Sequence, residues 1–210
     1  MTARLTYAFD AYCGWCYGFG PALRQFAADN TGRIDLHVLS GGLFSGPGAR
    51  PTAAYPHIPE ANNRITALTG VTFGQGYLDT LAEGTTVMDS TAAAKALIAL
   101  RAQAPTRALE LARALQEAWY VDGRSLSTPD THRIVAEAHD LDPAAVVAAF
   151  QNPKTAAAAR TEFRTLRRLG VDGYPTLLLH TDTGVHRLGG PVSTAAALTE
   201  ALNRHLSPAL

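Results

Sequence analysis

The sequence Asp10-Ala11-Tyr12-Cys13-Gly14-Trp15-Cys16-Tyr17 decides how this chain is interpreted, because it holds both cysteines of the 210 residues. A secreted disulfide scaffold spaces many cysteines along its chain, whereas a lone Cys-x-x-Cys in a cytosolic protein is typical of redox or metal chemistry. Residues 5–9 before the pair read as a strand, and residues 18–28 after it carry apolar side chains at helical spacing. We therefore expect the cysteines where a strand ends and a helix begins.

That position predicts different roles for the two thiols. A cysteine in the first turn of a helix faces unpaired N–H groups and the positive end of the helix dipole, which favour thiolate, so Cys13 is expected to be the nucleophile. Cys16 lies three residues on, on the same helix face, where the Cα separation of ~4.4–6.8 Å that a disulfide needs is accessible. We predict that Cys13 forms a mixed disulfide with a substrate and that Cys16 resolves it, or the reverse sequence.

Two other interpretations of the pair stay open at this point: a static local disulfide or pair of buried thiols, and half of a zinc site. Tetrahedral zinc needs two further ligands, and the seven histidines are scattered, with only His132 and His139 on one helical face. We therefore expect no metal ligands, and no cofactor other than the redox-active disulfide itself.

The rest of the chain predicts an α/β protein interrupted by helices. A second strand is expected at residues 34–39, but from about residue 44 to 152 no convincing strand appears, and a loop rich in Pro and Gly leads into successive helical patterns. A helix ending at Gly170, strands at 176–180 and 185–188, and a helix at 194–206 follow. This is the order of a thioredoxin-like fold, a central mixed sheet flanked by helices, with residues 1–43 and 153–210 forming one discontinuous domain and 44–152 an all-helical insertion.

Composition narrows the classes of partner. Eighteen basic residues balance eighteen acidic ones, so no global field favours nucleic acid or an anionic membrane surface. The first residues contain no apolar segment of the secretory type, and no run approaches eighteen consecutive apolar residues. We expect a soluble, cytoplasmic protein with no membrane or nucleic-acid partner.

Two segments carry a resemblance to a known family. Residues 9–19, Phe-Asp-Ala-Tyr-Cys-Gly-Trp-Cys-Tyr-Gly-Phe, resemble the active-site signature of the DsbA family, specifically its signal-less, FrnE-like branch, and Gly173-Tyr174-Pro175-Thr176 resembles the second signature of that family. The resemblance implies a protein-disulfide oxidoreductase or isomerase in which Pro175 is cis and faces Cys13. It also implies that Tyr174 holds substrate by backbone hydrogen bonds. The chain departs from the periplasmic oxidants by carrying Gly-Trp where they carry Pro-His.

Three neighbouring residues are expected to support the site. Gly14 and Trp15 lie between the cysteines and would tune them, and Trp15 is expected on the surface that contacts substrate. Asp10 either mediates proton transfer for Cys16 or caps the turn before Cys13. The expected partners are protein or small-molecule thiols and disulfides, with thioredoxin or glutathione as cellular redox partner.

Two alternative functions remain. Kappa-class glutathione transferases and 2-hydroxychromene-2-carboxylate isomerases share this fold and its helical insertion, but they typically carry a single serine at the first cysteine position, so the retention of Cys13 and Cys16 argues against that class. A non-catalytic metal-binding module using the two cysteines is the other alternative.

Overall fold

Four strands form the central sheet of the computed structural model, which describes residues 2–206. Their order is β2-β1-β5-β6, and they comprise β1 (Ala3–Phe9), β2 (Ile34–Ser40), β5 (Thr176–Thr181) and β6 (Gly184–Gly189). β1 pairs in parallel with β2 and antiparallel with β5, which in turn pairs antiparallel with β6. The sheet is therefore mixed, and the predicted fold class is confirmed.

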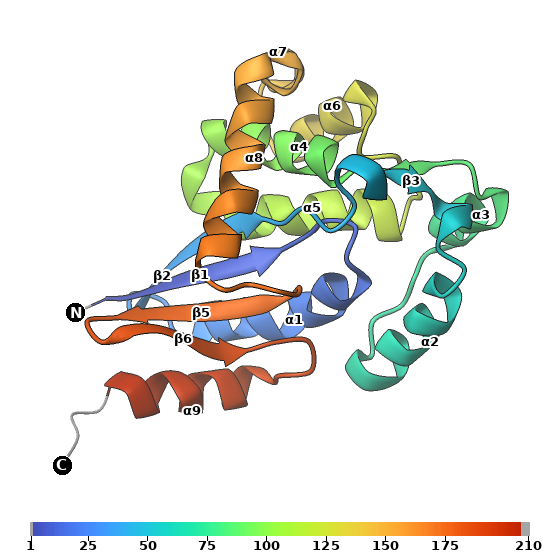
Figure 1. Cartoon of the computed structure of the whole chain (residues 1–210). Helices are drawn as coiled ribbons and strands as arrows, with labels where there is room; N and C mark the ends of the chain where they lie inside the picture. The colour runs from blue at the N-terminus through green and yellow to red at the C-terminus, as the bar shows by residue number, and fades with distance from the viewer. Residues whose placement is uncertain (1, 207–210) are drawn as a thin grey trace.

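Alternation along β1 and β5 sends side chains to two different cores. Leu5, Tyr7 and Phe9 share one buried cluster with residues of α1 (Gly14–Asp29) and α9 (Ala195–Leu206). On the other face, Ala8 packs in a second cluster with residues of α8 (Pro153–Arg168), and Figure 1 shows α8 crossing the sheet on the side opposite α1. The sheet is thus covered on both faces, as its buried strands require.

Six helices lie between β2 and α8 in the chain (Figure 1). They are α2 (Ile58–Thr69), α3 (Gln75–Glu83), α4 (Ser90–Gln103), α5 (Ala108–Tyr120), α6 (Pro129–Ala138) and α7 (Pro143–Gln151). Short 3₁₀ turns occur at Gly46–Gly48, Thr52–Ala54 and Pro105–Arg107. The division into a discontinuous domain and an insertion at residues 43/44 and 152/153 stays a prediction.

One detail differs from the sequence-based expectations. A two-residue strand pair, β3 (Arg50–Pro51) with β4 (Val87–Met88), forms within the segment expected to be purely helical. α1 begins at Gly14 and runs through Pro21, so Cys13 directly precedes its first residue and Cys16 lies in its first turn. Within residues 2–206, no helix combines the length and the apolar character that crossing a membrane requires.

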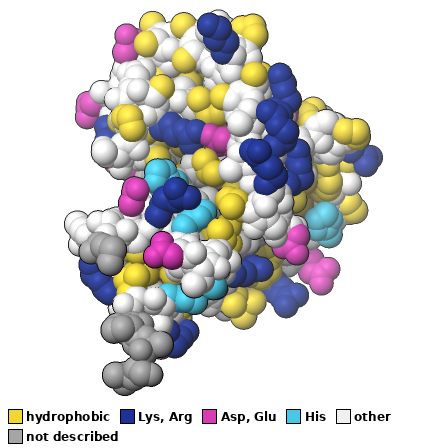
Figure 2. All heavy atoms as spheres, turned by 60° about the vertical axis from the view of Figure 1, so that its left-hand side comes forward, with side chains coloured by type: hydrophobic (Ala, Val, Ile, Leu, Met, Phe, Trp, Pro, Cys, Tyr) yellow, Lys and Arg dark blue, Asp and Glu magenta, His cyan; other side chains and the backbone are white. Residues whose placement is uncertain are grey.

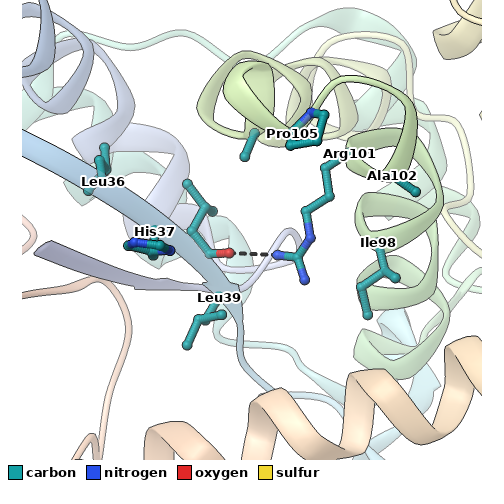
Figure 3. Close-up of a pocket in the computed structure, with 9 residues that line it drawn as sticks. Leu36, His37, Leu39, Ile98, Arg101, Ala102 and Pro105 are labelled. Carbon is teal, nitrogen blue, oxygen red and sulfur yellow. Dashed lines mark hydrogen bonds between the residues drawn. The ribbon is translucent and has the colours of Figure 1, made fainter. Parts of the chain in front are cut away.

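A partly buried ion pair joins the helical segment to the sheet. Arg101 on α4 donates to the Val38 carbonyl of β2 at 2.7 Å and pairs with Glu162 on α8. Glu162 in turn accepts a hydrogen bond of 2.8 Å from the backbone N–H of Ser40. Figure 3 shows Arg101 reaching from its helix to the edge of β2, beside a hollow of about 410 Å³. These contacts satisfy backbone groups that an edge strand would otherwise leave unpaired.

His132 on α6 makes the stability of this helical segment depend on pH. Its ring is fully buried, with its centroid 4.3 Å from that of Phe150, and burial together with the charge of Lys95 lowers its pKa from 6.5 to about 4. An unfolded chain would bind this proton below pH 6.5, whereas the folded protein binds it only below about pH 4. The free energy of unfolding that His132 contributes is therefore complete above pH 6.5 and is lost as the pH falls toward 4.

The free energy of unfolding of wild type should decrease between pH 7 and pH 4. We expect this decrease to be about 3 kcal/mol smaller in the His132→Leu variant, which has no imidazole to protonate. Chemical denaturation at a series of pH values measures this difference. His205→Gln, which removes an exposed histidine, serves as the control and should follow wild type. Parallel stability curves for wild type and His132→Leu would contradict the assignment.

Candidate active site

The turn between β1 and α1 places Cys13 directly before the first helical residue. The backbone N–H of Cys13 donates to the Asp10 carbonyl at 3.0 Å, and that of Cys16 donates to the Cys13 carbonyl at 2.9 Å. Cys13 occupies the N-cap position of α1 without a side-chain cap hydrogen bond. Its sulfur is therefore held at the helix N-terminus, where backbone N–H groups are unpaired and the dipole is positive.

The two thiols are both free but differ in access. Cys13 keeps 6% of its surface exposed, whereas Cys16 keeps none. Burial raises the pKa of Cys16 well above 9.0, and its hydrogen bond with Cys13 and the charge of that neighbour raise it further. Cys16 is thus a protonated, inaccessible thiol until the surface above it changes.

The loop that resembles the second signature lies against the first thiol. The thiol of Cys13 donates to the Tyr174 carbonyl at 3.5 Å, and the Tyr174–Pro175 peptide bond is cis. A side chain at Gly41 would come within 2.2 Å of the Tyr174 ring, so the glycine leaves room for this tyrosine. Residues 161 positions apart in the sequence therefore meet at the sulfur of Cys13.

Asp10 lies beneath the turn, with 1% of its surface exposed. One carboxylate oxygen accepts from the backbone N–H of Tyr12 at 3.0 Å and the other from that of Leu43 at 2.9 Å. Burial raises the pKa of Asp10 from 3.8 to about 6, although these two hydrogen bonds oppose the rise. The contacts are those of a cap, and the charge is also close enough to Cys16 to raise the pKa of that thiol.

The helical segment supplies a wall of the site that the sequence did not reveal. A hollow of about 150 Å³ beside Cys13 and Trp15 is also lined by side chains from residues 43–120. They are Leu43, Phe44, His57, Ile58, Ala61, Asn62, Ile65, Tyr77, Met88 and Tyr120. Tyr120 is buried, and it also lines this hollow.

α2 approaches the cysteine spacer closely. A side chain on Gly14 would meet Ile65 Cδ1 at 2.8 Å, and one on Gly18, a helical turn later, would meet Ile65 Cγ2 at the same distance. Trp15 is half-buried, and the Arg64 guanidinium lies 5.9 Å from the centre of its ring. Gly14 therefore leaves the space that Ile65 of α2 occupies, and Trp15 lines the hollow beside Cys13.

Together these features define the class of the protein: a thioredoxin-like α/β fold with a dithiol at the start of its first helix and a proline loop against the outer thiol. Residues 2–206 contain no group of three or more His, Cys, Asp or Glu side chains arranged to hold a metal ion. The chain belongs to the DSBA-like thioredoxin domain family, whose family model matches residues 4–191.

Solved structures agree with this assignment. The cytosolic disulfide reductase DsbM from Pseudomonas aeruginosa is 26% identical, with a TM-score of 0.82 over 96% of this chain and 98% of that one. Its structure with GSH gives 27% identity and a TM-score of 0.79 over 96% and 98% of the two chains. A protein from Nitrosomonas europaea assigned as a disulfide isomerase, 18% identical, shares the fold with a TM-score of 0.84 over 98% of each chain. No curated protein sequence matches the chain.

The unequal environments of the two thiols predict unequal alkylation. Iodoacetamide should modify Cys13 in the folded protein at least about tenfold faster than Cys16, because each unit by which burial raises the Cys16 pKa removes tenfold of its thiolate. Mass spectrometry of Cys13→Ser and Cys16→Ser reports each thiol separately. If the remaining cysteine of each variant were alkylated at the same slow rate, and both reached the rate of a free thiol only in denaturant, the predicted difference between Cys13 and Cys16 would be wrong.

Asp10 predicts a pH effect on Cys16. Above about pH 6 its carboxylate is charged and disfavours thiolate at Cys16, and below that pH the charge disappears. We expect Asp10→Asn to abolish the inflection near pH 6 in the rate at which Cys16 attacks a disulfide formed on Cys13, measured by rapid mixing. Asp89→Asn, which removes a carboxylate whose charge raises the pKa of Asp10, is the control and should keep the inflection at a lower pH. Retention of the inflection in Asp10→Asn would leave that residue a cap only.

Proposed function

We propose that this protein is a thiol–disulfide oxidoreductase or isomerase that exchanges disulfides through Cys13-Gly14-Trp15-Cys16. The observation that carries the proposal is the contact between the Cys13 thiol and the Tyr174 carbonyl at the start of α1. It places the sulfur of Cys13, the less buried of the two cysteines, beside main-chain groups that an extended peptide would pair with. Membership of the DSBA-like family supports the same chemistry.

The reaction proceeds in two exchange steps. The Cys13 thiolate attacks one sulfur of a substrate disulfide, forms the mixed disulfide and releases the other substrate sulfur as a thiolate, which takes a proton. The Cys16 thiolate then attacks Cys13, forms the intramolecular disulfide and releases the second substrate thiol. The substrate gains two electrons that a cellular dithiol or glutathione must return to the protein. Oxidation of a dithiol substrate is the same sequence in reverse.

The surrounding residues have distinct parts in this scheme. The carbonyl of Tyr174 loses the Cys13 thiol as its donor once the thiolate forms, so it is released for the substrate backbone. Pro175 has no N–H, so it cannot donate a hydrogen bond to the Cys13 thiolate. Trp15 would contact the substrate at the rim, and Gly14 keeps α2 close. Asp10 would accept the proton of Cys16 as that thiol attacks, since its pKa of about 6 lies near neutrality.

Trapping of the intermediate tests the proposal. Cys16→Ser should accumulate a mixed disulfide between Cys13 and a protein disulfide substrate, because the resolving thiol is missing, whereas Cys13→Ser should lose at least about a thousandfold of the turnover of wild type. Non-reducing electrophoresis and mass spectrometry identify the trapped bond. Full turnover by Cys13→Ser would refute the mechanism, and stoichiometric zinc in the purified protein would favour the metal-binding module.

Glutathione is the second candidate partner, and the DsbM structure with GSH is the observation that favours it. The cytosolic location stated for DsbM also favours an intracellular, reducing setting for this chain. Turnover of glutathione disulfide and of a protein disulfide by the same preparation separates the two substrate classes. Isomerisation of a carbon substrate that persists in Cys16→Ser would instead support the glutathione-dependent isomerase or transferase class.

A further inference from the structure

Every exposed charged residue of α8 is basic. Its exposed charged residues are Lys154, Arg160, Arg164, Arg167 and Arg168. The single acidic residue of the helix, Glu162, is buried and already paired with Arg101. Figure 2 shows a column of Lys and Arg side chains over this helix, on a chain whose formal net charge is zero.

These cations have no acidic partners among residues 2–206. None of the α8 arginines forms an ion pair within 4.0 Å with a described carboxylate, and Asp172, the next acid along the chain, forms none either. Exposed arginines elsewhere vary: Arg113 on α5 pairs with Glu117 and Arg133 on α6 with Asp130, whereas Arg4 and Arg204 form no ion pair with a described carboxylate. The α8 surface is thus distinctive in the number of basic residues on one helix and in the absence of an exposed acid among them.

Helix stability does not explain the pattern. Arg167 and Arg168 lie in the last turn, where cations favour the helix dipole, but Lys154 lies in the first turn, where they oppose it. Arg160, Arg164 and Arg168 follow one another at intervals of four residues, a spacing at which like charges repel. A sequence selected only for a stable helix would place acids between them, so the charge is better explained by an external partner.

The basic face ends beside the candidate active site. Arg164, Arg167 and Arg168 line a hollow of about 320 Å³. Leu166 and Leu169 of the same turn pack in one apolar cluster with Tyr174, whose carbonyl accepts the Cys13 thiol. The charge of Arg167 also lowers the pKa of Tyr174 against the rise that burial causes. The sixteen-residue helix extends the charge over about 24 Å from this point.

We infer that the exposed face of α8 binds an acidic segment of the protein that exchanges disulfides at Cys13. The inference rests on the proposed function, because it assigns the partner class of that same site. A partner protein would bring one of its cysteines to Cys13, beside Tyr174. The partner residues that neighbour this cysteine would then lie along α8. Carboxylates at a spacing of four residues would match Arg160, Arg164 and Arg168, which can each bind a carboxylate in a bidentate manner. A protein segment suits one helix face, whereas the zero net charge offers no wide field for nucleic acid or membrane.

Binding of a labelled, cysteine-free peptide of Glu repeats tests the surface without requiring exchange. The triple variant Arg160→Gln/Arg164→Gln/Arg168→Gln should weaken binding about tenfold by fluorescence anisotropy at low ionic strength, as three exposed ion pairs predict. The control Arg4→Gln/Arg113→Gln/Arg204→Gln loses the same charge elsewhere and should bind as wild type. Equal weakening by both variants would overturn the inference, and so would tighter binding of an anionic phospholipid vesicle or a single-stranded DNA oligonucleotide than of the peptide.

Two disulfide-containing peptides that differ only in a Glu or Gln tail then connect the surface to Cys13. Wild type and the control variant should have a higher kcat/KM for the Glu peptide, and the α8 variant should reduce that ratio to about one. Turnover of both peptides with no preference in wild type would overturn the inference alone. Failure to turn over either peptide would overturn the proposed function, and with it the assignment of the bound segment to a Cys13 substrate.

Discussion

The buried carboxylate of Asp10 connects the parts of the structure on which the site depends. One of its oxygens accepts a hydrogen bond from the backbone N–H of Tyr12, in the turn that places Cys13 at the start of α1. The other accepts from the backbone N–H of Leu43, in the loop that follows β2. Two hydrogen bonds to main-chain donors offset part of the cost of removing the carboxylate from water. The part of this cost that is not offset raises the pKa of Asp10 to about 6. The carboxylate that stabilises the turn therefore titrates near pH 6.

The helical segment is coupled to this turn by steric and by ionic constraints. Ile65 of α2 fills the space that side chains at Gly14 and Gly18 would occupy, and this close approach makes α2 a wall of the hollow beside Cys13. At the other end, Arg101 and Glu162 bind the edge of β2 and hold α4 against α8. A partly buried pair of this kind is costly to break on one side only, because the remaining charge would be unpaired. The helices are therefore part of the site and not an appendage.

Much of this arrangement could be predicted from the sequence, because it depends on local signals. These signals each span only a few residues: the alternation in residues 5–9, the position of the two cysteines, and the prolines in the first turns of α6, α7 and α8. The order of the elements then allows few topologies. The wall of the hollow could not be predicted, since Asn62, Ile65 and Tyr120 look like ordinary helical residues and are brought to Cys13 only by tertiary packing. Tyr120 illustrates this, because its aromatic ring is typical of a buried helical residue and does not indicate that it lines the hollow beside Cys13.

The distribution of charge follows from the demands of thiol chemistry. A cation or anion within a few ångströms of Cys13 or Cys16 would shift the balance between thiol and thiolate, so charges used for recognition would interfere with the exchange if they lay at the sulfurs. The hollow beside Cys13 is accordingly lined mainly by apolar and aromatic side chains. Beyond the screening length of about 8 Å at physiological salt, charges can attract a partner without acting strongly on the thiols. The basic face of α8 ends next to the apolar cluster that includes Tyr174, so under the proposed function one helix would bind a partner while the start of α1 would carry out the exchange.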